Sequence, residues 1–339
     1  MWIRRIRDGS NRMIQQIDDN LYCIKVPLAG SALGSLNSYF FRGAGEDFLM
    51  DTGFNTAACE ESLRGSLKEL GADINRINII NTHLHADHTG LNHWFCGPDK
   101  HIYISETDHQ GVLTYYKGKG YKRAERDRRE GVDERTYQRM LSHGPETDKR
   151  ERFFDEEKFV GLKDGDVIDT GNVKLKMVLV PGHTPGNSMF YIEDKKILFT
   201  GDHVLFDITP NITCWPGVEN ALQEYLASLE RSRALDVELA LPGHRSPGNY
   251  YERIDSILRH HKRRLDEVTG IITETPGLNA YEITKRMRWK IHLDPDGSMP
   301  PAQLWFAAGE CMSHLDKLVA DGVIVREDTE PYITYRIKE

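Results

Sequence analysis

The chain has 339 residues and a formal net charge of −8, and its apolar fraction of 39% is enough to build a core in about two domains. Net acidity disfavours general nucleic-acid binding, no apolar run is long enough to span a membrane, and the N-terminal residues do not form a secretory signal. Five scattered cysteines without a CxxC pair argue against a disulfide scaffold or a cysteine-based zinc site, and they favour a reducing, cytoplasmic location.

The N-terminal half begins with elements of a sheet and then changes character. Hydrophobic patterning predicts strands at 21–26, 38–41 and 48–50, a helix over 59–70, and a short buried strand at 78–80. Residues 110–160 are polar, and 117–129 contain seven basic and two acidic side chains. We interpret 110–160 as a helical, basic insertion or lid. Its basic stretch is either an entrance for an anionic substrate, lined by Tyr115, Tyr116 and Tyr121, or a solvated helix face.

The second half predicts more sheet and then a helical appendage. Strands are expected at 173–180, 189–192, 197–199 and 237–241, with an amphipathic helix through Leu222, Leu226 and Leu229. Helices over 250–274, 279–287 and 302–320 precede two β segments at 323–325 and 332–337. Three helices followed by a hairpin are the element order of a winged helix. We therefore expect a catalytic domain over 1–250 and a winged-helix-like domain over 251–339.

Histidine and aspartate cluster where predicted strands end. The segment NTHLHADHTG at 81–90 follows an apolar run, and its imidazoles and carboxylate would be costly to bury without a partner. A divalent ion offsets that cost. Three later residues each follow an apolar strand and a glycine, which lets the chain turn sharply. The seven candidate ligands, enough for two ions, are His83, His85, Asp87, His88, His183, Asp202 and His244.

The remaining nine histidines are interpreted differently. His203 follows Asp202 directly. It could support the ligands from behind, contact the substrate, or have no role in the site. Surface or ordinary core positions are expected for the other eight, which are His93, His101, His109, His143, His260, His261, His292 and His314.

Residues 18–250 resemble the metallo-β-lactamase-fold hydrolase superfamily. The resemblance rests on FLMDTG at 48–53, THLHADHTG at 82–90, PGHTPGN at 181–187, TGDH at 200–203 and LPGH at 241–244. It implies an α/β fold, an αββα sandwich with metals at one edge. It also implies that His83, His85 and His183 hold one ion and that Asp87, His88 and His244 hold the other. Asp202 would bridge the ions, and Asp51 would fix the metal loop from behind.

Two departures narrow the resemblance. Asp202 stands where many zinc β-lactamases carry cysteine, which is similar to the glyoxalase II and lactonase branches. Leu91 stands where many glyoxalase II-like members have a second glycine. The C-terminal helical region and the stretch 201–217 resemble the β-lactamase-like protein 2 group, whose members are linked to small-molecule hydrolysis and to RNA cleavage.

The expected activity is hydrolysis of a small ester, thioester or lactone by metal-bound hydroxide. Two ions about 3.5–4 Å apart supply hydroxide near neutral pH and stabilise an oxyanion. Asp87 and Asp202 are the expected catalytic carboxylates, and no GxSxG nucleophile motif is present. Nitrogen and oxygen ligands without thiolate favour Zn2+, with Fe and Mn as alternatives. The expected partner is a small, anionic acyl substrate.

Two rival functions use the same metal centre. An endoribonuclease or other phosphodiesterase is the main alternative, but residues 265–339 carry eight basic and thirteen acidic side chains, which suits nucleic acid poorly. We therefore interpret this region as a lid or a dimerisation module, which makes a homodimer an expected assembly. The second rival is redox chemistry, as in the diiron flavoproteins of this fold, which carry a flavodoxin domain. The sequence after residue 250 has no phosphate-binding glycine loop for a flavin, which argues against this rival.

Overall fold

The chain divides into two units. The computed structural model describes residues 13–116, 123–142, 155–290 and 298–339. Unit 1 comprises residues 1–118, 147–210 and 231–254, and unit 2 comprises 119–146, 211–230 and 255–339. This division differs from the predicted boundary at residue 250, because 119–146 and 211–230 belong with the C-terminal elements. Residues of the basic stretch (Lys117, Lys119, Tyr121 and Lys122) lie outside the described residues, as do the side chains of Tyr115, Tyr116 and Arg123. So do His143 and His292, for which surface or core positions were expected.

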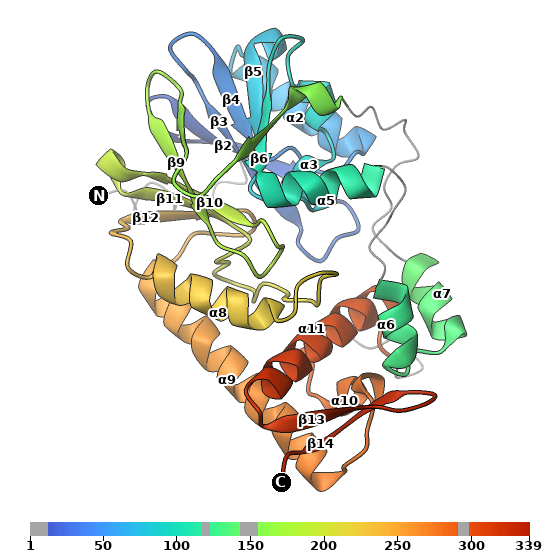
Figure 1. The fold of residues 1–339 in the computed structure, drawn as a ribbon. Helices are drawn as coiled ribbons and strands as arrows, with labels where there is room; N and C mark the ends of the chain where they lie inside the picture. Colours follow the sequence, from blue (N-terminus) through green and yellow to red (C-terminus); the bar gives the residue numbers. More distant parts are fainter. Residues whose placement is uncertain (1–12, 117–122, 143–154, 291–297) are drawn as a thin grey trace. The chain divides into compact units, whose positions relative to one another are not determined.

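Unit 1 contains a seven-stranded sheet, with its strands in chain order (Figure 1). The first four strands pair antiparallel, and the fourth to seventh pair parallel. The strands are β1 Ile14–Asp18, β2 Leu21–Pro27, β3 Ser35–Phe41, β4 Asp47–Met50, β5 Ile77–Ile80, β6 Ile102–Ser105 and β7 Phe159–Leu162. Strands β1, β6 and β7 were not predicted, since each has only four or five residues.

The second sheet of unit 1 has five strands in the order β12-β11-β10-β9-β8. Strands β8 to β11 form an antiparallel meander, and β12 joins β11 in parallel. Their bounds are β8 Val167–Asp169, β9 Lys174–Leu179, β10 Ser188–Ile192, β11 Ile197–Gly201 and β12 Leu239–Pro242. Strands β9 and β11 both run antiparallel to β10, so β9, β11 and β12 share one direction and end at the same edge.

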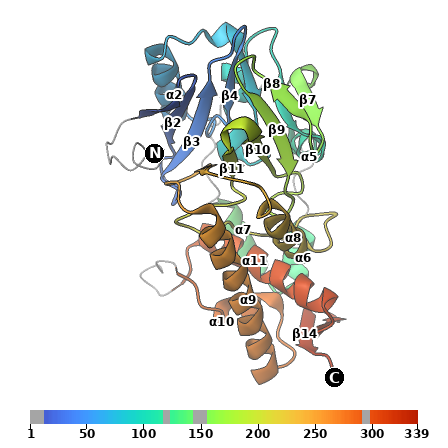
Figure 2. The same cartoon turned by 90° about the vertical axis from the view of Figure 1, so that its left-hand side faces the viewer.

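The two sheets pack face to face around an aromatic and aliphatic core. Phe41 of the first sheet contacts Phe199 of the second edge to face, with ring centroids 5.1 Å apart. Helix α2 (Ala57–Glu69) buries Leu63 and Leu67 on the outer face of the first sheet. The segment 231–254 contributes the edge strand β12 to the second sheet, whose strands β8 to β11 are labelled in Figure 2. The Tyr191 hydroxyl of β10 donates to the Asp236 carbonyl of this segment. These layers confirm the predicted sandwich.

Short helices follow the strands of the first sheet. They are α3 (Ala86–Thr89), α4 (Asn92–Phe95) and α5 (Glu106–Tyr116). Helices α8 (Ala221–Ser232) and α9 (Tyr250–Glu274) each contribute residues to both units. The bounds of α9 match the prediction, and the helix ends just before Pro276 and Gly277.

Unit 2 is mainly helical. It adds α6 (Arg123–Arg129), α7 (Glu134–Ser142), α10 (Ala280–Arg286), α11 (Pro301–Ala320) and the hairpin of β13 (Ile324–Asp328) and β14 (Ile333–Ile337). The predicted asparagine cap is present, since Asn279 accepts from the Glu282 amide and the Glu282 carboxylate accepts from the Asn279 amide. The helices pack on a core that includes Ile283, Leu315 and Tyr335.

Three arginines of the basic stretch form ion pairs within unit 2. Arg126 forms a bidentate ion pair with Asp316 at 2.6 and 2.9 Å. Arg128 contacts Glu134, and Arg129 contacts Asp328 and Glu330. The three arginines therefore have carboxylate partners, and this pairing attaches α6 to the C-terminal elements. Residues 119–146, which the prediction placed in the catalytic domain, are grouped with unit 2.

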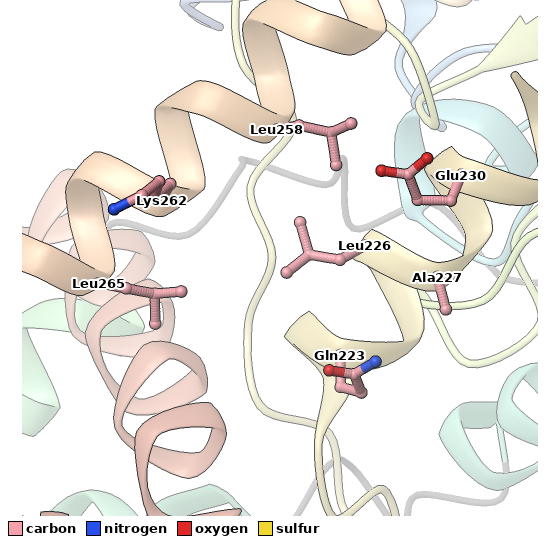
Figure 3. A pocket seen from close by; sticks show the side chains of 7 residues that line it. All are labelled: Gln223, Leu226, Ala227, Glu230, Leu258, Lys262 and Leu265. Carbon is pink, nitrogen blue, oxygen red and sulfur yellow. The ribbon is translucent and has the colours of Figure 1, made fainter. Parts of the chain in front are cut away.

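A groove of about 320 Å³ also lies within unit 2, between α8 and α9 (Figure 3). Leu226, Leu258 and Leu265 line it, and Glu230 and Lys262 lie at its rim. None of the helices in the described ranges combines the length and the apolarity that crossing a bilayer requires.

Candidate metal centre

All seven candidate ligands lie at one edge of unit 1. His83, His85, Asp87 and His88 follow β5, with Asp87 and His88 on α3. His183, Asp202 and His244 follow β9, β11 and β12, whose ends share the corresponding edge of the second sheet. An isolated bridge between Leu36 and His244 joins the two sheets here. The strand-end argument from sequence therefore placed these residues together correctly.

The side chains form groups that could each hold a metal ion. The ligand atoms of each group lie within 4.8 Å of one another. The groups are His83 with His85 and His183, Asp87 with His88 and His244, and His83 with His88 and Asp202. We call the first the three-histidine triad and the second the Asp87 triad. Their composition equals the ligand sets that the family resemblance implied.

Asp202 lies between the two triads. Its Oδ2 is 3.7 Å from His183 Nε2 and 3.5 Å from His244 Nε2, and its Oδ1 is 3.7 Å from His88 Nε2. Oδ1 is buried and has no hydrogen-bond partner among the described residues. A buried carboxylate oxygen of this kind, facing imidazole nitrogens that are acceptors when neutral, fits a shared divalent cation.

Asp51 holds the loop that carries four of the ligands. Its Oδ1 accepts the Thr82 amide at 2.9 Å, and its Oδ2 accepts the Thr82 hydroxyl at 2.8 Å. Oδ2 also lies 2.8 Å from His88 Nδ1, which leaves Nε2 of that ring directed to the site. Asp51 has a φ of 60°, a left-handed conformation that aspartate tolerates better than most residues. Asp51 therefore contacts both the metal loop and one of its candidate ligands.

Burial and neighbouring charges favour the metal-binding protonation states. Burial lowers the pKa of His83 well below its usual value, and with help from His183 it lowers the pKa of His85 to about 3. Burial alone would raise the pKa of Asp87 and Asp202, but adjacent histidines, chiefly His88 and His244 respectively, lower it below the ordinary range. The imidazoles of His83 and His85 are therefore neutral, and the carboxylates of Asp87 and Asp202 are ionised, at neutral pH.

His88 and His244 differ from His83 and His85. Burial alone would lower the pKa of each ring, but Asp202 and Asp87 raise the pKa of His244. The carboxylates of Asp51, Asp87 and Asp202 raise the pKa of His88 well above the usual value. In the metal-free protein this ring is held as a cation between acids, so binding of an ion displaces its proton.

His203 does not join the ligand groups. Its side chain is buried, and its Nε2 lies 3.4 Å from Ser232 Oγ. Among the other described histidines, His101 is exposed and His109 stacks on Phe159, while His261 and His314 form a buried pair in unit 2 with ring nitrogens 3.1 Å apart. These positions agree with the surface or core placement that was expected.

Sequence reasoning missed Asp108, a fully buried carboxylate behind the site. It lies in the first turn of α5, directly after β6. The pattern Ile102, Ile104 and Ser105 ahead of Asp108 is an apolar strand followed by a helix-capping serine, and it was the signal that could have pointed to the residue.

Comparisons with known proteins agree with the geometry. The family described as "Metallo-beta-lactamase superfamily" matches residues 32–244. The chain is 24% identical to a beta-lactamase-like protein 2 homolog of Caenorhabditis elegans, over 88% of this chain and 84% of the relative. It is 28% identical to the acyl-coenzyme A thioesterase MBLAC2 of Bos taurus, over 61% of this chain and 72% of the relative.

A solved structure resembles nearly the whole chain. A metallo-beta-lactamase family protein from Thermus thermophilus superposes with a TM-score of 0.76 at 26% identity, covering 95% of this chain and all of that one. The sandwich, the ligand cluster at its edge and the family match lead to one assignment: the chain is a hydrolase that belongs to the metallo-β-lactamase superfamily.

Proposed function

We propose that the chain is a dinuclear metal-dependent hydrolase of a small ester, thioester or lactone. The observation that supports this most is the pair of triads with the Asp202 carboxylate between them. The three-histidine triad would hold one ion, the Asp87 triad the other, and Asp202 would contact both. Nitrogen and oxygen donors without thiolate favour Zn2+, with Fe and Mn as alternatives.

The bound ions would supply an acidified water near neutral pH and would polarise the scissile carbonyl. The chain's own groups prepare this chemistry. Asp87 and Asp202 stay ionised, so each can accept a hydrogen bond from a water in the site. Such a hydrogen bond would orient the water toward the substrate. The His244 ring is fixed because its Nδ1 lies 2.9 Å from the Ser35 carbonyl oxygen, which leaves Nε2 for the site.

A thioester is the best-supported substrate within this class. The relative from Bos taurus is named an acyl-coenzyme A thioesterase, and its similarity covers 61% of this chain. The phosphodiesterase alternative gains no support from unit 2, because Arg126, Arg128 and Arg129 already contact carboxylates. We propose a small acyl compound, and not nucleic acid, as the partner.

The test combines metal content with a substrate panel. Purified protein loaded with zinc is assayed on an acyl-CoA, a lactone, a glutathione thioester and single-stranded RNA. His85→Ala should lose metal affinity and turnover together. Each loss should exceed about 100-fold, which is the upper range for removing a hydrogen-bond partner of a metal ligand. His101→Ala, which changes an exposed histidine elsewhere in unit 1, is the matched control and should keep both.

Two outcomes would contradict the proposal. Full turnover by His85→Ala with both ions bound would exclude the triad as the reaction centre. If the protein cleaves RNA and none of the acyl substrates, the nuclease alternative would be correct and acyl hydrolysis would be excluded.

A further inference from the structure

Asp108 connects the two loops that carry the three-histidine triad. Its Oδ2 accepts the Leu84 amide at 2.9 Å and the Thr184 hydroxyl at 2.6 Å, and its Oδ1 accepts the Gly186 amide at 2.6 Å. Leu84 lies between His83 and His85, and Thr184 directly follows His183. One carboxylate therefore fixes the backbone beside all three histidines, although the histidines come from different sheets.

The surrounding packing leaves this carboxylate little freedom. The side chain is fully buried, and the Asp108 amide donates to Ser105 Oγ at 3.1 Å. A Cβ on Gly186 would lie 2.2 Å from Ser105 Oγ and 2.7 Å from Asp108 Oδ1, so only glycine allows the approach. The Ser188 amide donates to the Thr82 carbonyl at 2.9 Å and joins the same two loops a second time.

We propose that Asp108 is a positioning residue that holds His83, His85 and His183 in register for one ion of the pair. The inference rests on the proposed metal centre and goes further by dividing the work between two buried carboxylates. Asp51 contacts His88 of the Asp87 triad and, through Thr82, also supports His83. The three hydrogen bonds of Asp108 go to Leu84, Thr184 and Gly186, which lie beside histidines of the three-histidine triad. Loss of Asp108 should therefore weaken the binding of one ion and leave the affinity for the other ion unchanged.

The substitution that tests this is Asp108→Asn. The amide has the same shape but places an NH₂ group where a carboxylate oxygen accepted hydrogen bonds, so a donor meets a donor in one of the two loops. Thr184→Val removes one of the three hydrogen bonds without changing the charge at Asp108. Asp47→Asn is the matched control, since Asp47 is a buried carboxylate of β4 that accepts the Gly43 amide, at 3.2 Å, away from the ligand loops.

Zinc affinity is measured for each of the two equivalents by competition with a chelator, and Co2+ titrations followed by visible spectra report the geometry of each site. Asp108→Asn should weaken one equivalent by about 10–100-fold and alter the spectrum of that equivalent alone. Thr184→Val should do so by a smaller factor, and Asp47→Asn should change neither. Wild-type affinity and spectra in Asp108→Asn would overturn the proposal. So would equal weakening of both equivalents, which a merely structural role predicts.

Hydrogen exchange of the metal-free protein separates this inference from the proposed function. Without Asp108, deuterium uptake should rise together in the peptides around Leu84 and Gly186, and it should stay unchanged in Asp47→Asn. If wild type binds no metal and this uptake rises, the metal centre is refuted while the link between the loops stands. If wild type binds two ions and uptake does not rise, Asp108 is not the link.

Discussion

Gly243→Ala is a direct steric probe of the metal centre. Gly243 lies between β12 and His244, and an added Cβ would be 2.7 Å from Asp202 Oδ1 and 3.1 Å from His88 Cε1. The backbone cannot move away, because the Gly243 amide donates to the Gly201 carbonyl at 2.9 Å and its carbonyl accepts the Asn37 amide at 2.7 Å. The Asp202 carboxylate must therefore shift by roughly 0.5–1 Å to restore an ordinary contact.

This shift has two measurable consequences. Zinc affinity should fall by about 10–100-fold, since Asp202 contacts both triads, and the free energy of unfolding of the metal-free protein should fall by about 1–3 kcal/mol. Chelator competition and urea unfolding measure them. Gly65→Ala in α2 is the control, because nothing lies within 4 Å of the added Cβ and alanine favours a helix by about 1 kcal/mol. Wild-type zinc affinity and stability in Gly243→Ala would refute the packing argument.

Two further predictions concern unit 2. Burial lowers the pKa of His314 to about 3, so the unfolded state binds the extra proton, and stability present above about pH 6.5 is lost as the pH falls. From neutral pH to pH 5 the free energy of unfolding should drop by about 2 kcal/mol on this account, and His314→Gln should remove that part of the drop in urea titrations; an unchanged pH profile would contradict it. Arg126→Ala leaves Asp316 without its cation and should cost about 3 kcal/mol by urea unfolding, whereas Arg64→Ala, in an exposed pair, should cost less than about 0.5 kcal/mol. If both variants lost the same free energy of unfolding, burial of the Arg126–Asp316 pair would not determine its contribution to stability.

The ligand cluster was predictable because its signals are local. Each ligand directly follows an apolar strand, and glycines at 182, 201 and 243 mark where the chain leaves the sheet. The structure explains two of these glycines by close packing, since a Cβ at Gly201 would meet Thr82 at 2.9 Å and one at Gly243 would meet Asp202. Strand direction then brings the ligands to one edge without any further information.

The parts that escaped prediction depend on contacts between distant segments. Asp108 acquires its role only because β6 places it beside Thr184, 76 residues further along the chain. Likewise, residues 119–146 join unit 2 because Arg126 meets Asp316, 190 residues away. Periodicity and capping patterns describe neighbours in sequence, so they predicted helices in this segment but not the unit to which the helices belong.

The placement of the ligands links metal binding to the closure of the sandwich. Each triad takes two ligands from the loop after β5 in the first sheet and one from a strand end of the second sheet, His183 or His244. Neither triad is complete unless the two sheets are packed together, so an ion that binds a triad stabilises that packing by its own binding free energy. Asp51 acts within the first sheet, whereas Asp108 and Asp202 span both sheets. Asp87 also contacts His244 across the sheets, at 3.3 Å. These three carboxylates are therefore residues through which a disturbance of the core should reach the metal centre.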